Sequence, residues 1–256
     1  MQKIVLLGKN ISHSRSPSFL NPIFRREGYP WHYELMPVEP EELAKAIEMM
    51  KRGGYRGANV TSPYKDAVIP LMDELSPEAE RIGAVNTIRF EAGRAFGANT
   101  DIVGFANSLR NEPLLSGPFT VAVLGTGGAA RAAVDALLRL ENLTHLRLLS
   151  RTPGTGAREL GRWNDSRTEG GLLTHAFTSD LIVHATPIGL PGRPGMVLRP
   201  DQLTGCRLLY EMIYGPGETE LMREARRMGI EVKDGGEMFE GQALGAVRVW
   251  GMTIAG

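Results

Sequence analysis

The chain of 256 residues contains one cysteine, Cys206, so neither a disulfide nor a thiolate metal cluster can form within it. Such sparse cysteine use fits a reducing cytoplasm. Long apolar runs are lacking as well. The segment MQKIVLLG carries a charge at Lys3 and reaches Gly8 after a few apolar residues, too few for a signal-peptide core or a membrane span. We therefore expect a cytoplasmic protein without a membrane anchor.

An excess of charge is also missing. The 29 basic and 29 acidic side chains give a net charge of zero, so no global field attracts nucleic acid or an acidic membrane surface. The histidines at positions 13, 32, 145, 175 and 184 show no ligand spacing such as HExxH. We expect no metal and no nucleic-acid partner, and an anionic small molecule needs a local pocket.

The secondary-structure pattern alternates short β-rich runs with helical segments, which predicts an α/β protein with mostly parallel sheets. The length allows two domains. A hairpin is expected around Glu91-Ala92-Gly93-Arg94, and the breaker-rich run NEPLLSGP (111–118) places a boundary near residues 101–116. The expected strands are 3–8, 32–36, 57–60, 87–90, 95–98, 120–124, 146–149, 181–184, 207–212 and 231–233; the expected helices are 18–27, 40–52, 64–71, 129–140, 218–228 and 238–250.

A glycine-rich turn follows the strand at 120–124 and opens an alanine-rich helix, in TVAVLGTGGAARAAVDALL. Gly125 permits a tight turn, Gly127 lets the backbone approach a pyrophosphate, and the small Ala130 allows close helix–strand packing. Glycine-rich turns that bind nothing are also common. After the next strand, Arg151 stands where an acidic residue would grip a ribose hydroxyl in an NAD site, which favours the 2′-phosphate of NADP. The alternatives are a solvated loop arginine, or Arg158 as a second phosphate contact.

Three polar strings in the first half follow apparent strands, at the end where open α/β sheets bind ligands. They are SHSRSP (12–17), GANVTSPYKD (57–66) and GANTDIVG (97–104). For Ser14 and Ser16 the alternative is helix capping ahead of Pro17.

Lys65 and Asp101, in the second and third of these strings, are the residues that could move a proton. Reduction of a ketone by hydride leaves an alkoxide that must be protonated, and a lysine beside a carboxylate serves either direction. The alternatives are a solvated lysine and a helix-capping aspartate.

Together these strings resemble the shikimate dehydrogenase family over nearly the whole chain. The order of motifs is SHSRSP, GANVTSPYKD, AVNT (84–87), GANTDIVG, GTGGAARA, SRT (150–152), HATPIGL (184–190), the MIYGPGETEL run and Gln242. The resemblance implies an NADP-dependent oxidoreductase that reduces 3-dehydroshikimate to shikimate in aromatic amino-acid biosynthesis.

The resemblance also implies a domain plan and a set of site residues. Residues 1–101 and 238–256 would form the substrate domain, with the final helix returning to it, and residues 102–237 a Rossmann-like NADP domain. Lys65 and Asp101 would be the catalytic pair. Substrate contacts would come from Ser14, Ser16, Asn59, Thr61, Asn86, Tyr214 and Gln242, and NADP contacts from Gly125, Gly127, Gly128, Ala129, Ser150, Arg151, Thr152, Thr186 and Ile213.

The sequence departs from the family pattern at several positions. His184 and Ser150 stand where asparagine is usual, and Glu237 stands where glycine is common. Further departures are Leu20, Ser62, Ile102 and Leu190. Two alternatives therefore stay open: a related enzyme acting on quinate or another cyclic hydroxy acid, and a binding protein with weak activity. A monomer and a homodimer are equally compatible with the sequence.

Overall fold

The computed structural model describes residues 2–215 and 217–253, and the chain forms two compact units. The first unit contains Met1–Thr100 and Gln242–Gly256, and the second contains Asp101–Gly241. Each has one sheet. None of the helices formed by the described residues combines the length and the apolar character that crossing a bilayer requires.

The sheet of the first unit has the strand order β2-β1-β3-β5-β6-β4. β1, β2 and β3 are parallel, β5 runs against β3, and β6 runs against β5, so β6 points the same way as β1. The carboxyl ends of β1, β3 and β6 therefore meet at one edge, where β5 begins. The elements are β1 (Gln2–Gly8), α1 (Ser16–Arg26), β2 (Trp31–Pro37), the 3-10 helix η1 (Pro40–Glu42), α2 (Leu43–Lys51), β3 (Tyr55–Val60), the 3-10 helix η2 (Ile69–Leu71), β4 (Glu74–Leu75), α3 (Pro77–Ile82), β5 (Thr87–Glu91) and β6 (Arg94–Ala98).

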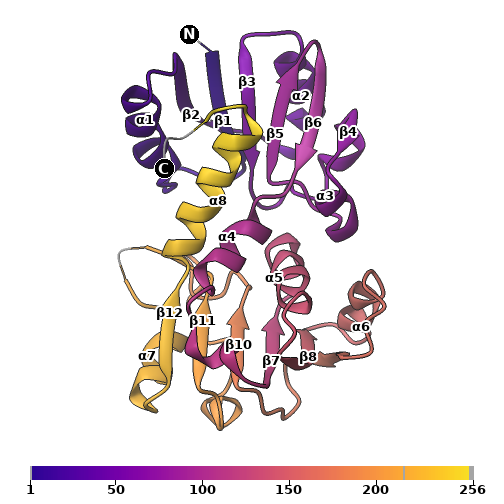
Figure 1. The fold of residues 1–256 in the computed structure, drawn as a ribbon, viewed down its shortest axis with the longest axis vertical. Coiled ribbons are helices and arrows are strands. Elements are labelled where there is room, and N and C mark those ends of the chain that lie inside the picture. The colour runs from indigo at the N-terminus through magenta and orange to yellow at the C-terminus, as the bar shows by residue number, and fades with distance from the viewer. Residues whose placement is uncertain (1, 216, 254–256) are drawn as a thin grey trace. The chain divides into compact units, whose positions relative to one another are not determined.

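Helices cover both faces of this sheet because successive side chains of a strand point to opposite faces. In β1, Ile4 and Leu6 pack with α1 and with the C-terminal part of α8 (Gly236–Val249). Val5 and Leu7 pack with α2 and α3 on the other face. Figure 1 shows α8 in front of the strands, α2 behind them and α1 beside β2. Each face therefore has its own core.

The sheet of the second unit is entirely parallel, with the order β12-β11-β10-β7-β8-β9. This is the doubly wound order, in which the direction of winding reverses between β7 and β10. The elements are α4 (Asp101–Ser108), the 3-10 helix η3 (Pro113–Ser116), β7 (Phe119–Leu124), α5 (Gly128–Leu138), β8 (Leu143–Ser150), α6 (Thr155–Leu160), β9 (Thr168–Leu172), β10 (Leu181–His184), the 3-10 helix η4 (Pro200–Leu203), β11 (Leu208–Glu211), α7 (Glu220–Arg227) and β12 (Glu231–Asp234). The predicted α/β class with a Rossmann-like second unit is confirmed.

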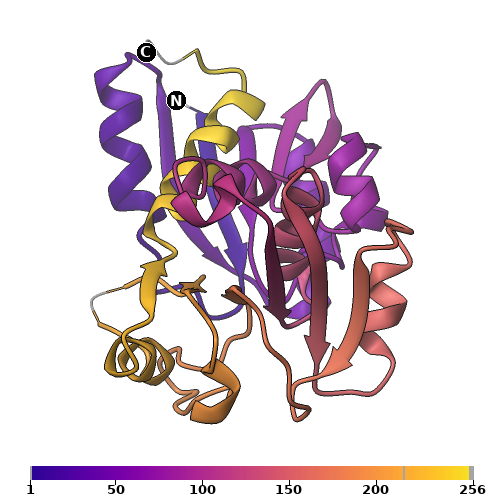
Figure 2. The same cartoon turned by 60° about the horizontal axis from the view of Figure 1, so that its bottom comes forward.

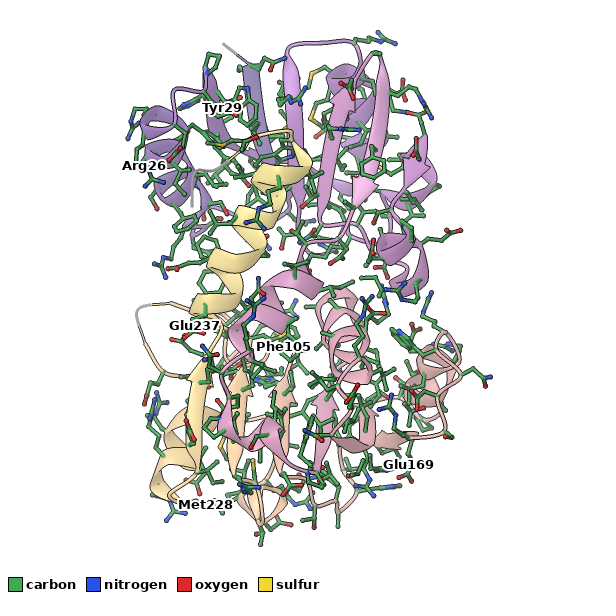
Figure 3. The ribbon with its side chains drawn as sticks, in the orientation of Figure 1. Arg26, Tyr29, Phe105, Glu169, Met228 and Glu237 are labelled. Carbon is green, nitrogen blue, oxygen red and sulfur yellow. The ribbon has the colours of Figure 1, made fainter. Side chains whose placement is uncertain are left out.

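Helices also pack closely in the second unit. α4 packs against α5, and Phe105 of α4 lies edge-on to Tyr210 of β11 with ring centroids 5.0 Å apart (Figure 3). α6 packs along the edge strand β9 (Figure 2). Close packing of α6 on the sheet requires glycine, because a Cβ atom at Gly170 would overlap the α6 backbone and one at Gly156 would overlap the Leu148 carbonyl of β8.

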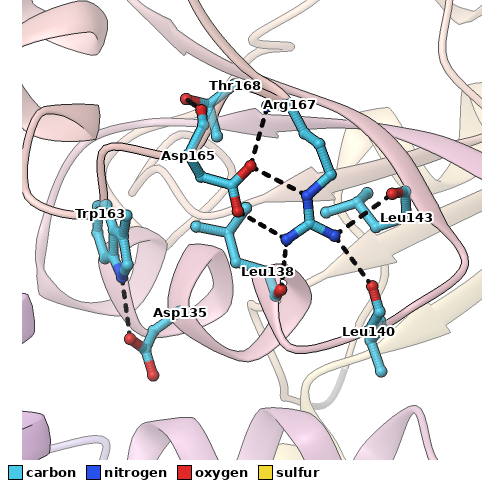
Figure 4. Close-up of polar contacts among 8 residues, drawn as sticks. All are labelled: Asp135, Leu138, Leu140, Leu143, Trp163, Asp165, Arg167 and Thr168. Atoms are coloured by element: carbon cyan, nitrogen blue, oxygen red, sulfur yellow. Dashed lines mark hydrogen bonds and ion pairs between the residues drawn. The ribbon is translucent and has the colours of Figure 1, made fainter.

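Arg167 ties the end of α5 to the loop before β9 (Figure 4). Its guanidinium donates to the Leu138 carbonyl at 2.6 Å and to the Leu140 carbonyl at 3.2 Å, and it pairs with Asp165 at 2.7 Å. A cation at this position satisfies carbonyls that the last turn of a helix leaves unpaired.

One predicted helix, residues 64–71, is wrong. Val68 donates to the Tyr64 carbonyl at 3.0 Å, which forms one helical turn. The helix does not continue, because Ile69 donates to the Asp66 carbonyl at 3.2 Å and Pro70 lacks an N–H. The Lys65 carbonyl accepts instead from Val85 N–H at 2.8 Å. The sequence did not predict the helices α3, α4 and α6, the strands β4 and β9, or the 3-10 helices η3 and η4. The predicted functional boundaries after residues 101 and 237 stay a prediction, while the compact units divide after Thr100 and Gly241.

Candidate functional site

Ser14 and Ser16 follow β1 at the edge where the carboxyl ends of β1, β3 and β6 meet. The two hydroxyls are 3.2 Å apart, and Ser14 Oγ also accepts from the N–H of Ser16 at 3.3 Å. Arg15 is the N-cap residue of α1 and makes no side-chain capping bond. Of the two serines, only Ser14 accepts from a backbone N–H at the start of α1, so the capping alternative applies to Ser14 alone. Paired hydroxyls beside a helix start suit an anionic oxygen.

A buried amide network joins β3, β5 and the chain after β6. Asn59 accepts from the Tyr33 hydroxyl at 2.8 Å and donates at 3.1 Å both to the Asn86 carbonyl and to Thr87 Oγ1. Asn86 Oδ1 in turn accepts from Thr100 N–H at 2.8 Å. The two N–H groups of the Asn59 amide are thus used inside the protein, and this residue holds Asn86 in place.

Thr61 and Lys65 lie on the turn that follows β3. Thr61 N–H donates to the Leu7 carbonyl at 2.9 Å, so the turn is fixed to the end of β1. The Lys65 carbonyl accepts from Val85, which is the residue before Asn86. The structure therefore brings the backbones of Thr61 and Lys65 to the edge that carries Asn59 and Asn86.

The other predicted substrate-side residues lie elsewhere in the fold. Asp101 is the first residue of α4, directly after Thr100, and its side chain is buried. Tyr214 follows β11, and its ring lies 4.8 Å from that of Phe239. Gln242 lies in the middle of α8.

The glycine-rich turn has the geometry that the sequence predicts. Gly125 follows β7 with a φ of +105°, which is unfavourable for residues with a side chain. A Cβ atom there would lie 3.0 Å from the Ala185 carbonyl oxygen and 3.2 Å from the Thr186 methyl group. At Gly127, the N-cap residue of α5, a Cβ atom would meet none of the described residues within 4 Å. The turn is therefore closed on one side and open at the helix start, as a pyrophosphate cradle requires.

Gly128 and Ala129 are the first two residues of α5, and Ala130, the third, is fully buried. Beyond the neighbouring strand β8, the Ser150 hydroxyl donates to the Thr152 carbonyl at 2.7 Å, which shapes the segment that exposes Arg151. This segment and the glycine turn share the carboxyl end of the sheet. The residues present fit the pyrophosphate and the 2′-phosphate of NADP.

Thr186 and Ile213 follow β10 and β11 at the same end of the sheet. Between them lies a buried pair, His184 and Glu211, whose Nδ1 and Oε2 atoms are 2.8 Å apart. His184 Nε2 is 2.6 Å from the Thr186 hydroxyl, and Glu211 Oε1 accepts from Ile213 N–H at 3.1 Å. The loop after β10 is thus held by His184, and the loop after β11 is held by Glu211. In the described part of the chain, no three His, Cys, Asp or Glu side chains are grouped to hold a metal ion.

Comparison with known proteins agrees with this geometry. The shikimate dehydrogenase substrate binding domain matches residues 6–88. The shikimate dehydrogenase (NADP⁺) of Salinibacter ruber is 37% identical over 97% of this chain and 92% of that protein, and that of Halothermothrix orenii is 35% identical over 97% and 90%. The chain belongs to the shikimate dehydrogenase family. The crystal structure of the Thermus thermophilus shikimate 5-dehydrogenase in complex with NADP(H) and shikimate covers 100% of this chain and 95% of its own, with 32% identity and a TM-score of 0.88.

The structure shows the surroundings of the residues that depart from the shikimate dehydrogenase pattern. Leu20 is fully buried in the core between α1 and the first sheet. Ile102 is buried at the start of α4, while Ser62 is exposed. Glu237 is exposed on the first turn of α8 (Figure 3) and pairs with Lys233 at 2.9 Å, so its charge is offset locally. Leu190 is half-buried, and nothing in the structure explains its choice.

Sequence reasoning missed three residues that shape these sites. Thr87 and Thr100 are buried hydroxyls whose Oγ1 atoms are 3.2 Å apart in the network around Asn86. Glu211 is fully buried. A usable signal for Glu211 was an acidic residue within the apolar strand LLYEMIY, because such a charge is rarely buried without partners.

Proposed function

We propose that this chain catalyses the reversible reduction of 3-dehydroshikimate to shikimate with NADPH. Membership of the shikimate dehydrogenase family is the observation that carries this proposal. The glycine turn with Arg151, and the polar edge of the first sheet, supply sites for a dinucleotide phosphate and for a polyhydroxy acid. We also propose that the protein acts in the cytoplasm as a monomer or homodimer.

Burial raises the pKa of its one thiol, Cys206, to about 12, which suits a non-reactive structural cysteine.

We propose that Lys65 and Asp101 form the catalytic pair. The Lys65 carbonyl accepts from Val85 N–H. Asn86, the residue after Val85, accepts from Thr100 N–H through its side-chain oxygen. Asp101 is the next residue along the chain. Two short segments that carry the two side chains are thus fixed to one dipeptide, which supports a shared role.

NADPH, when bound, supplies the hydride. Lys65 would donate a proton to the oxygen of the reacting carbonyl as it becomes a hydroxyl, and would take that proton back in the oxidation. Asp101 would hold the ammonium group and a ring hydroxyl. Ser14 and Ser16 would donate to the substrate carboxylate, and Thr61, Asn86, Tyr214 and Gln242 would contact the ring. A substrate that lacks one hydroxyl would leave a polar group unpaired, which gives specificity.

The first experiment follows reduced-nicotinamide absorbance with shikimate and with quinate, each with NADP and with NAD. Turnover of shikimate with NADP supports the proposal. A preference for quinate would replace the substrate. Ligand binding by calorimetry without turnover in any mixture would leave the binding-protein alternative.

Lys65→Ala should lower kcat by about two to four orders of magnitude, because proton transfer contributes about that much to the rate. Thermal unfolding should match the wild type, since the Lys65 backbone bond to Val85 is kept. A variant that folds normally and turns over at the wild-type rate would refute Lys65 as the proton donor.

Arg151→Ala should raise the KM for NADP about tenfold or more and leave that for NAD nearly unchanged, because a charge-assisted bond to phosphate is lost. Arg158→Ala is the matched control, an exposed arginine of the same segment with a smaller expected effect. Equal increases for NADP and NAD would show that Arg151 does not contact the 2′-phosphate.

A further inference from the structure

The pair His184 and Glu211 is a buried polar network next to the proposed cofactor site. His184 is 1% exposed and Glu211 is 0% exposed. The two residues lie at the carboxyl ends of β10 and β11. The register of these parallel strands places His184 opposite Glu211. A buried charge persists only when its bonding capacity is met.

Glu211 meets that requirement through three donors. Its Oε2 accepts from the Thr219 hydroxyl at 3.0 Å and is 2.8 Å from His184 Nδ1, and its Oε1 accepts from Ile213 N–H. Thr219 itself caps α7 by accepting from Met222 N–H at 3.2 Å. Because both Glu211 oxygens accept from other donors, we assign Glu211 as a carboxylate, which can only accept, and place a proton on His184 Nδ1.

We assign His184 as the neutral imidazole, in which Nε2 is an acceptor, and the group within reach is the Thr186 hydroxyl at 2.6 Å. In this assignment Thr186 donates its proton to His184. Its oxygen accepts from Ile188 N–H at 3.3 Å and keeps lone-pair capacity, while the side chain is half-buried beside the Gly125 turn.

We propose that His184, held by Glu211, is a positioning residue that presents the Thr186 oxygen as an acceptor to an N–H or O–H donor on the nicotinamide half of the cofactor. This inference rests on the proposed function. Asparagine, usual at this position in the family, is too short to span both contacts, so the imidazole supplies a bond to Thr186 that asparagine does not.

Two replacements separate the positioning role from a structural one. In His184→Asn the amide nitrogen reaches the place of Nδ1, so Glu211 keeps its donor and Thr186 loses its partner. In the conservative variant His184→Gln the amide reaches the place of Nε2, so Thr186 keeps a partner and Glu211 loses a donor. We expect His184→Asn to weaken NADP binding about three- to tenfold with a near wild-type Tm, because one hydrogen bond is lost. We expect His184→Gln to lower the Tm and to retain most of the affinity.

A double-mutant cycle with Thr186→Val completes the test. If His184 acts through Thr186, adding His184→Asn to Thr186→Val should cost no further affinity. With the NADP analogue that carries an acetyl group in place of the carboxamide, loss of the His184→Asn effect identifies the carboxamide as the donor, and persistence of the effect identifies a ribose hydroxyl.

The outcomes distinguish the inference from the proposed function. Wild-type protein that binds NADP with an affinity unchanged by His184→Asn overturns the inference alone. Additive losses in the cycle also overturn it, because they show that His184 acts independently of Thr186. Wild-type protein that binds neither NADP nor NAD overturns the proposed function together with the inference.

Discussion

Asn59 shows that a polar side chain at the carboxyl edge of a sheet can support other residues. Both of its N–H groups are used by Asn86 and Thr87, and its oxygen accepts from the Tyr33 hydroxyl. The sequence indicated a polar residue at the end of a strand, where open α/β sheets commonly bind ligands. It could not indicate the direction of the amide, because that direction depends on partners that are remote along the chain.

Asn59→Asp should therefore destabilise the protein by about 1–3 kcal/mol, since a carboxylate oxygen replaces an N–H that faces the Asn86 carbonyl. Urea unfolding measures the change. Asn111→Asp, at an exposed turn, is the matched control and should change stability by less than about 0.5 kcal/mol. Equal effects at the two positions would contradict the supporting role of Asn59.

At the scale of elements, the network around Arg167 joins three parts of the second unit. Arg167 bonds to carbonyls at the end of α5, to the Leu143 carbonyl at the start of β8 at 3.5 Å, and to Asp165 (Figure 4). The bond from Arg167 lowers the pKa of Asp165. A carboxyl group with a lowered pKa stabilises the fold above its ordinary pKa, and this contribution is lost as the pH falls through the lowered value.

Arg167→Lys should lower the Tm by a few degrees at neutral pH, because an ammonium group cannot reproduce the forked contacts. The difference from the wild type should shrink as the pH falls from about 4, the ordinary pKa of an aspartate, through the lowered pKa of Asp165 in the folded protein. Arg199→Lys is the control, since Arg199 pairs with Asp201 in the same local way but both side chains are more than half exposed. A difference that does not depend on pH would show that Asp165 has no part in it.

The elements that the sequence predicted well are those whose pattern reports local geometry. The hairpin turn is one case: Ala92 and Gly93 both have positive φ, as the predicted turn requires. The helix expected at 64–71 fails for the opposite reason. Tyr64 and Val68 have helical spacing, yet the bond that ends the turn comes from Val85, which is distant in sequence.

At the scale of the whole molecule, the sequence predicted two α/β units and most of the groups that line their carboxyl edges. The turn at Gly125 and the exposed position of Arg151 could be predicted because each depends on one short segment. The joint arrangement of His184 and Glu211 was not, because it depends on the pairing of β10 with β11.

The first unit is discontinuous in sequence, and this affects the order in which the protein can be built. Trp250 is fully buried in its core and donates to the Ile88 carbonyl at 3.0 Å, while a Cβ atom at Gly57 would overlap the indole. A nascent chain that has reached residue 241 contains the whole second unit but still lacks Trp250. During synthesis the second unit can therefore fold before the first. Until the last turns of α8 have been made, one apolar face of the first unit stays uncovered, and chaperones bind such exposed apolar surface.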